Sequence, residues 1–65
     1  MIMKFRFVDE DGILIKQTEN NIFLPTKGDL IFLNNELFCV MYLCFDYDEN
    51  IIEIHLEIEI PLESQ

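Results

Sequence analysis

The stretch from residue 37 to residue 60 constrains the fold more than any other part of the chain. Residues 51–60 alternate between apolar and polar side chains, which is typical of a β-strand with one buried and one solvated face. Residues 37–45 are apolar at every position, so a strand there presents apolar side chains on both faces. The acidic segment 46–50 joins them as a turn. Together these segments predict a long β-hairpin around which the rest of the chain is organised.

The remaining apolar runs are short, and turn residues separate them at intervals of roughly ten residues. Three further strands are expected, at residues 2–8, 13–16 and 30–33. Turns are expected at Asp9–Gly12, Thr26–Asp29 and Asn34–Glu36. Residues 17–21 are polar and are expected to form a loop, and residues 62–65 a frayed tail. The sequence therefore predicts an all-β fold: one domain over residues 1–65, built as a small five-stranded antiparallel barrel or meander.

The length of the turn after residue 45 decides which row of the apolar strand faces the core. A three-residue loop over residues 48–50, with Asn50 in the left-handed conformation, directs one row to the isoleucine face: Phe38, Val40, Tyr42 and Cys44. A two-residue loop over residues 48–49 directs the other row there: Leu37, Cys39, Met41, Leu43 and Phe45. Asn50 favours the first register, because Asn tolerates the left-handed position that ends such loops.

In either register, one apolar row lies beside the polar row of residues 53–59. An apolar row flanked by carboxylates is typical of a recognition surface. The candidate partner-binding residues are Leu37, Cys39, Met41, Leu43, Phe45, Glu53, His55, Glu57 and Glu59. His55 stands between two of these carboxylates and is a candidate pH-sensitive contact.

The net charge of −9 is confined to one part of the chain. Four basic and four acidic residues cancel within residues 1–27, whereas residues 28–65 contain nine acids and no Lys or Arg. Such a field repels nucleic-acid phosphates and anionic membrane surfaces, and it attracts basic proteins. Direct binding to nucleic acid or to a membrane is therefore not expected.

These features favour a non-catalytic interaction module, which forms a homo-oligomer or acts as a small subunit that binds a partner protein through the apolar row. A domain of 65 residues has a small core, and a homodimer would compensate for it. The alternative is an acidic inhibitor that imitates nucleic acid. Its carboxylates recur about every 6.8 Å along a strand, near twice the rise of a nucleotide, and would occupy the basic groove of a nucleic-acid-binding protein.

The residues offer little for catalysis or for a metal. The chain has one His, and its two cysteines have no basic neighbour in the sequence, so no enzyme, cofactor or metal site is expected. The spacing Asp46-x-Asp48-x-Asn50 is similar to a calcium loop, but Ile51 stands where such a loop needs Gly, and a plain acidic turn is expected.

Cys39 and Cys44 are expected to be free thiols. On a regular strand, residues five positions apart lie on opposite faces and about 17 Å apart, at about 3.4 Å per residue, so they cannot bridge. Free thiols fit a reducing compartment, and no apolar run is long enough for a membrane helix, so a cytoplasmic protein is expected.

Turn and core positions over residues 24–59 follow a known order. These are Leu24-Pro25, Gly28-Asp29-Leu30-Ile31, the hairpin into Phe38-Cys39-Val40, the acidic turn Asp46-Tyr47-Asp48 and the last alternating strand. This order resembles that of SH3-like small β-barrels, including small proteins of phages and mobile elements. The resemblance implies a barrel fold and a function in binding, and it assigns no catalytic residue.

Overall fold

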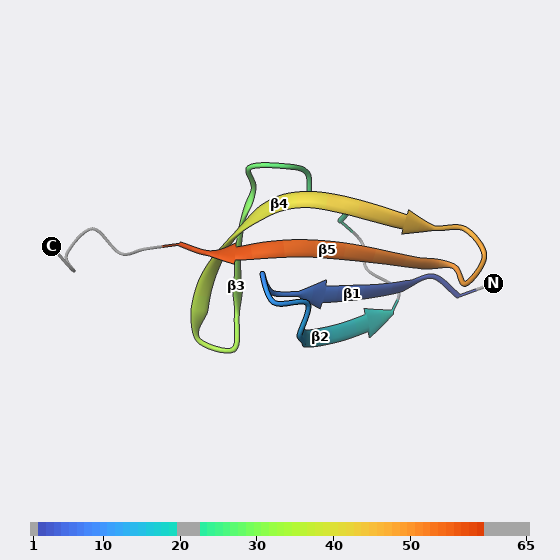
Figure 1. Ribbon diagram of the computed structural model, residues 1–65, viewed down its shortest axis with the longest axis horizontal. Coiled ribbons are helices and arrows are strands. Elements are labelled where there is room, and N and C mark those ends of the chain that lie inside the picture. The colour runs from blue at the N-terminus through green and yellow to red at the C-terminus, as the bar shows by residue number, and fades with distance from the viewer. Residues whose placement is uncertain (1, 20–22, 60–65) are drawn as a thin grey trace, which may run out of the picture.

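The computed structural model describes residues 2–19 and 23–59, and the fold is shown in Figure 1. Its five strands are β1 (Lys4–Val8), β2 (Leu14–Glu19), β3 (Leu30–Leu33), β4 (Glu36–Asp46) and β5 (Ile51–Ile58). They form a single sheet in the order β2-β1-β5-β4-β3. Within these described residues there is no helix, and hence none of the length and apolar character needed to cross a membrane.

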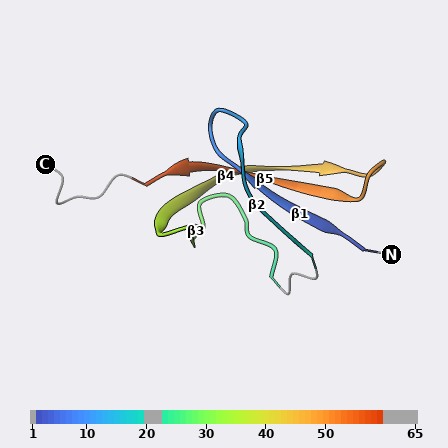
Figure 2. The same ribbon diagram turned by 90° about the horizontal axis from the view of Figure 1, so that it is seen from below.

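The sheet confirms the predicted all-β fold and its five strands. It curls into a nearly closed barrel, with β3 and the loop before it on the concave side (Figure 2), and this arrangement is compatible with an SH3-like barrel. Three pairings are antiparallel, but β1 and β5 pair in parallel, which a purely antiparallel barrel does not contain. The parallel pair follows from the strand number, because four reversals of direction separate β1 from β5.

The core lies on the concave face, where alternate residues of the central strands meet. Its buried members are Phe5, Phe7, Phe38, Val40, Ile52, Ile54 and Leu56. On β5 the buried and partly exposed residues alternate from Ile52 to Leu56, as the period-two pattern predicts. Half-buried side chains of β2, β3 and β4 pack against this cluster: Ile15, Ile31, Leu33 and Leu43.

A β-bulge at Met41 decides the register of the long hairpin. Between Tyr42 and the turn, β4 pairs with β5 so that Leu43 lies opposite Ile54 and Phe45 lies opposite Ile52. Beyond the bulge, Val40 lies opposite Leu56. One extra residue reverses which side chains face inward, so both registers considered from the sequence occur, one on each side of Met41.

The bulge corrects two sequence expectations. Tyr42 and Cys44 lie opposite His55 and Glu53 and so face outward, although the preferred register directed them to the core. Cys39 and Cys44 were expected on opposite faces, but Cys39 lies opposite Glu57 and both thiols are on the outer face. The left-handed conformation of Asn50 is confirmed at φ 59°, but Asp46 pairs with Ile51, so the loop has four residues, 47–50, rather than the three or two expected.

Residues 17–19 belong to β2 rather than to the predicted loop. Arg6 lies opposite Gln17 and Lys4 opposite Glu19, so this polar segment continues the pairing with β1. Polar side chains are compatible with a strand at the edge of a sheet, because one side of such a strand is solvated. Residues 20–21 and the predicted tail at 62–65 lie outside the described residues.

Carboxylates of Asp residues hold three of the turns. Asp9 Oδ1 accepts hydrogen bonds from the backbone N–H groups of Asp11 and Ile13, and Asp29 Oδ2 accepts one from Thr26, all at 2.9 Å. In the β4–β5 turn, Asp46 Oδ1 accepts the N–H groups of Asp48 and Glu49 at 3.0 and 3.1 Å. The first carboxylate of the calcium-like spacing is thus bonded to its own turn.

Removing the Asp46 carboxylate is expected to destabilise the hairpin. Asp46→Ala leaves two backbone N–H groups of the turn to water, and we expect the free energy of unfolding to fall by about 1 kcal/mol. Asp46→Asn is the matched control, because it keeps an oxygen acceptor at the same place and should retain most of the stability. Urea unfolding of the three proteins measures the difference, and an equal loss in Ala and Asn would contradict the role of the acceptor.

Candidate functional site

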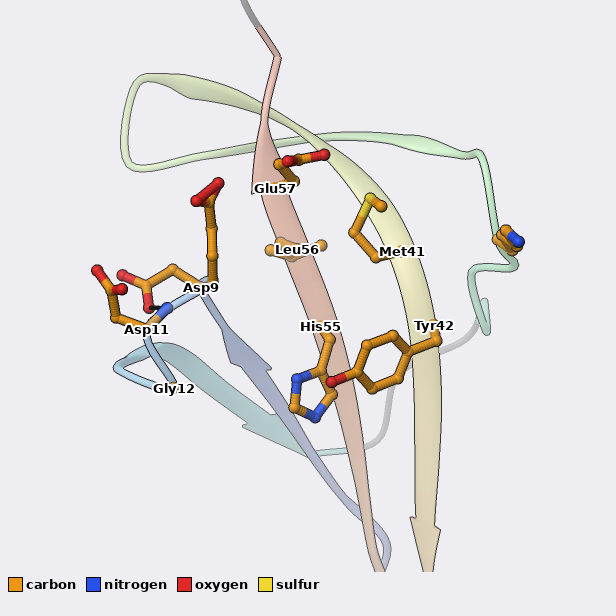
Figure 3. Close-up of a pocket in the computed structure, with 10 residues that line it drawn as sticks. Asp9, Asp11, Gly12, Met41, Tyr42, His55, Leu56 and Glu57 are labelled. Carbon is orange, nitrogen blue, oxygen red and sulfur yellow. Dashed lines mark hydrogen bonds between the residues drawn. The ribbon is translucent and has the colours of Figure 1, made fainter.

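The candidate site is the convex, outer face of the sheet, on the side of β4 and β5 away from the core. The β1–β2 loop rises on this side of the sheet (Figure 2). Figure 3 shows Met41, Tyr42 and His55 on neighbouring strands, with the acidic loop beyond the end of β1 facing them. The face is built by simple alternation: since Ile54 and Leu56 point into the core, His55 and Glu57 point outward.

An exposed apolar patch covers the end of this face formed by β3 and β4. We define the outer apolar patch as Leu30, Phe32, Leu37 and Cys39. The strand register places Phe32 opposite Leu37 and Leu30 opposite Cys39, so the four side chains form two adjacent cross-strand pairs. Phe32 is 67% exposed and Leu30 59%, which leaves most of each side chain in contact with water. Large apolar side chains that gather in this way mark a surface with a partner more often than isolated ones do.

Two exposed carboxylates flank the outer apolar patch. Glu57 lies opposite Cys39, and the backbone N–H of Glu59 donates a hydrogen bond to the Leu37 carbonyl at 2.9 Å. At the other end of β5, Glu53 lies beside Arg6 of β1 and contacts His55. Glu53 therefore has Arg6 and His55 as neighbours, whereas Glu57 and Glu59 lie next to the patch.

His55 is held between an aromatic ring and a carboxylate. Its imidazole stacks on the Tyr42 ring, with the centroids 4.3 Å apart and the planes at 17°. His55 Nε2 lies 3.1 Å from Glu53 Oε1, and the two side chains are 22% and 38% exposed. The Tyr42 side chain fixes the orientation of His55 and leaves its ring partly open to solvent.

A shallow hollow of about 770 Å³ lies beside this stack. Its lining residues are Asp9, Glu10, Asp11, Gly12, Lys27, Met41, Tyr42, His55, Leu56 and Glu57. Acids outnumber the single lysine, so the hollow carries net negative charge, although the Asp9 carboxylate also accepts hydrogen bonds within its own loop. A cationic side chain of a bound protein would be favoured there by charge and by the Tyr42 ring face.

The structure brings part of the predicted site together and separates the rest. Leu37, Cys39, Glu57 and Glu59 lie side by side, and Met41 and His55 line the neighbouring hollow. Leu43 and Phe45 lie opposite Ile54 and Ile52, on the concave face, away from Glu53 and His55. The bulge at Met41 causes this separation.

Sequence reasoning missed Leu30, Phe32, Tyr42 and Cys44 on the outer face. The strand Leu30–Leu33 is apolar at all four positions, as β4 is, and this signal predicts that one of its rows lies outside the core. The positions of Tyr42 and Cys44 depend on the bulge, which leaves no residue signature in an apolar strand.

The site has few groups suited to chemistry. Of the residues that the structure describes, no three His, Cys, Asp or Glu side chains are close enough to hold a metal ion. Both cysteines are free thiols, Cys39 half-buried and Cys44 exposed. What this face offers is apolar area, carboxylates and one stacked imidazole.

Comparisons of the chain with models of known families, with curated proteins and with solved structures found no match.

Proposed function

We propose that this protein is a non-catalytic interaction module whose outer apolar patch binds a partner protein that presents apolar and basic side chains. The observation that carries the proposal is the placement of Phe32 and its neighbours, exposed on a sheet face directly beside Glu57 and Glu59. The patch and the acids lie outside the core cluster, whose buried members are on the opposite face.

The patch has the composition of the centre of a protein interface. Aromatic side chains at such centres carry much of the binding free energy, and polar residues around them exclude competing water. Phe32 lies on a strand of only four residues whose inner row, Ile31 and Leu33, packs on the core. The backbone beneath the patch is therefore held in place, which reduces the entropy lost on binding.

Charge selects the kind of partner. All of the net charge of −9 comes from residues 28–65, the segment that contains the patch and its flanking acids. A basic partner is attracted over a distance of about 10 Å at moderate ionic strength, and an acidic one is repelled. We expect association to slow as salt is added, because electrostatic steering acts mainly on the association rate.

Phe32→Ser is the test of the apolar part. Proteins captured from the source cells by the wild-type chain are purified and titrated against the variants. We expect Phe32→Ser to weaken the affinity for a true partner by at least about 30-fold, which is the effect of losing a hot spot of about 2 kcal/mol. Tyr47→Ser is the matched control: Tyr47 is 84% exposed and lies in the β4–β5 turn, at the far end of the hairpin. Equal weakening by both variants would reject the patch.

Charge-neutralising variants test the acidic part. Glu57→Gln with Glu59→Gln should lower the association rate and flatten its dependence on salt. Asp48→Asn with Glu49→Gln removes the same charge from the distant turn and serves as the control. Binding that ignores salt, or that responds alike to both pairs of substitutions, would contradict a basic partner.

The alternative of a phage-type acidic inhibitor that occupies a basic groove stays a prediction. On the outer face of β5, His55 interrupts the row of carboxylates, and Glu53 is engaged with it. That alternative predicts that Phe32→Ser has little effect while the Glu57 and Glu59 substitutions abolish binding.

The free thiols support the proposed reducing, cytoplasmic compartment.

A further inference from the structure

The far half of β4, from Met41 to Asp46, has one unpaired edge. The strand pairing of β3 with β4 ends at Leu30 opposite Cys39, and the last backbone bonds on that side join Val40 to Gly28 and Asp29, both at 2.8 Å. Beyond Val40, no described residue pairs with this edge, whereas β5 pairs with the opposite edge as far as Asp46. In Figure 1 this half of β4 extends past β3 toward the turn.

Two residues of this segment direct their backbone polar groups to the free edge. Val40 has its side chain in the core, and its N–H and C=O bond toward the β3 side. Along one strand, residues with side chains on the same face direct their backbone groups to the same edge. Leu43 and Phe45 also face the core side, so their N–H and C=O groups point to the free edge, where no described residue pairs with them.

Apart from the bulge at Met41, the free segment lacks the features that usually protect a sheet edge. Residues 41–45 contain no charge, Pro or Gly, and Met41, Tyr42 and Phe45 are 38%, 57% and 45% exposed. The other described edges are protected: β2 carries Lys16 and Glu19, and β3 is only four residues long. An apolar, unpaired edge is a template for another strand.

We propose that this edge pairs with the same edge of a second copy, so that two sheets join as one continuous sheet in a homodimer. A second copy fits because the segment is uncharged until Asp46, in a chain whose net charge of −9 makes most other contacts between copies repulsive. The inference stands independently of the proposed partner-binding function, which uses the outer apolar patch rather than the strand edge.

Symmetry and backbone direction narrow the possible registers of the pair. Residues that face each other across an antiparallel pair have side chains on the same face of the sheet. A two-fold axis between two copies of one strand therefore lies midway between the two copies of a single residue. An axis at Cys44 pairs Leu43 of each copy with Phe45 of the other. This pairing uses the N–H and C=O groups of both residues, which are the four backbone groups that each copy directs to the free edge. An axis at Leu43 would instead place Phe45 against the bulged Met41, where the ladder is disrupted.

The Cys44-centred register avoids like charges and brings the two Cys44 residues together. Asp46 of each copy faces Tyr42 of the other, so no two acids oppose each other. The Cys44 residues form a non-hydrogen-bonded pair, with Cα atoms about 4.5 Å apart, inside the range of about 4.4–6.8 Å that a disulfide spans. Cys39 lies beyond the bulge, beside β3, and is far from the axis.

Sedimentation equilibrium of the full chain, from micromolar to millimolar concentration, tests the dimer. We expect a reversible dimer that strengthens with added salt, because screening reduces the repulsion between two chains of charge −9. Cys44→Asp places two carboxylates opposite each other and should weaken the dimer at least tenfold. Gln17→Asp makes the same charge change on β2, an exposed position at the opposite edge of the sheet, and should leave the dimer affinity within twofold.

The native cysteines provide an independent readout. Diamide, which accepts the two thiol hydrogens, should cross-link the wild type and Cys39→Ser as dimers, and should leave Cys44→Ser uncross-linked yet still dimeric in solution. A monomer at millimolar concentration in high salt, equal effects of Cys44→Asp and Gln17→Asp, or cross-linking that depends on Cys39 would each overturn the proposal. Because Phe32→Ser leaves this edge intact, loss of partner binding and loss of the dimer can be told apart.

Discussion

Ile54→Ala is expected to unfold most of the protein at temperatures at which the wild type is folded. Ile54 is fully buried at the centre of β5, between Phe7 of β1 and Leu43 of β4. Truncation removes buried methyl and methylene groups and leaves a cavity, and such changes cost about 2–5 kcal/mol. A domain of this size has a free energy of unfolding of only about 3–10 kcal/mol, at about 0.05–0.15 kcal/mol per residue.

Ile58→Ala is the matched control for this prediction. Ile58 lies on the same strand and the same face, but it is 45% exposed, so the same truncation removes less buried area and creates no closed cavity. Thermal unfolding followed by circular dichroism measures both variants. We expect Ile54→Ala to lower the midpoint by about 8–40 °C, at about 4–8 °C per kcal/mol, and Ile58→Ala by less than half of that. Similar midpoints would show that the core does not centre on Ile54.

The sequence predicts the core and the strands well because both depend on local patterns. The alternation from Ile52 to Leu56 fixes the buried face of β5 without reference to its neighbours. The turns are equally local, since Asp-Gly at 11–12 and Asn50 provide the positive φ values that the backbone requires. These features need no knowledge of which strands pair.

The outward-facing residues are harder to predict because they depend on a non-local choice. In residues 37–45 an apolar side chain stands at every position, so no residue type marks the place where the strand bulges. Val40 is held between Asp29 and Leu56, and the turn fixes the other end of the hairpin. Between these two points β4 has one residue more than β5, and Met41 is that unpaired residue. Because of this single bulge, Tyr42 and Cys44 lie on the outer face, where the preferred sequence register would have placed Leu43 and Phe45.

The polar residues in β2 also show that strand pairing, which is non-local, can override a prediction made from local composition. Gln17 and Glu19 have low strand propensity, yet they pair with Arg6 and Lys4 because β1 offers a free ladder along their whole length. The opposite charges of Lys4 and Glu19 favour this pairing. Tertiary pairing therefore extends a strand that local composition ends three residues early.

Gly28→Ala is expected to loosen β3 and, with it, the outer apolar patch. Gly28 has φ +94°, a conformation that L side chains rarely adopt, and its N–H donates to the Val40 carbonyl at 2.8 Å. A Cβ at this position meets no atom within 4 Å, so the cost is backbone strain alone, about 1–3 kcal/mol. That strain falls on the residues just before β3, whose backbone bonds to Val40 help hold the start of β3 on β4.

Hydrogen exchange locates the effect. In Gly28→Ala we expect faster exchange at the amides of Val40 and of residues 30–33, while the amides of β5 stay protected, because local opening detaches an edge strand before the core unfolds. Lys27→Ala is the control for a substitution in the same turn at an exposed residue without positive φ.

A chain synthesised with D-Ala at position 28 separates strain from the loss of glycine itself. A D-residue favours positive φ, so it should keep the exchange rates of β3 near those of the wild type while L-Ala raises them. If Phe32 is the centre of partner binding, L-Ala should also weaken binding and D-Ala should not, because the patch exists only while β3 is held on β4. Fast exchange in both proteins would mean that the turn needs glycine for a reason other than its φ.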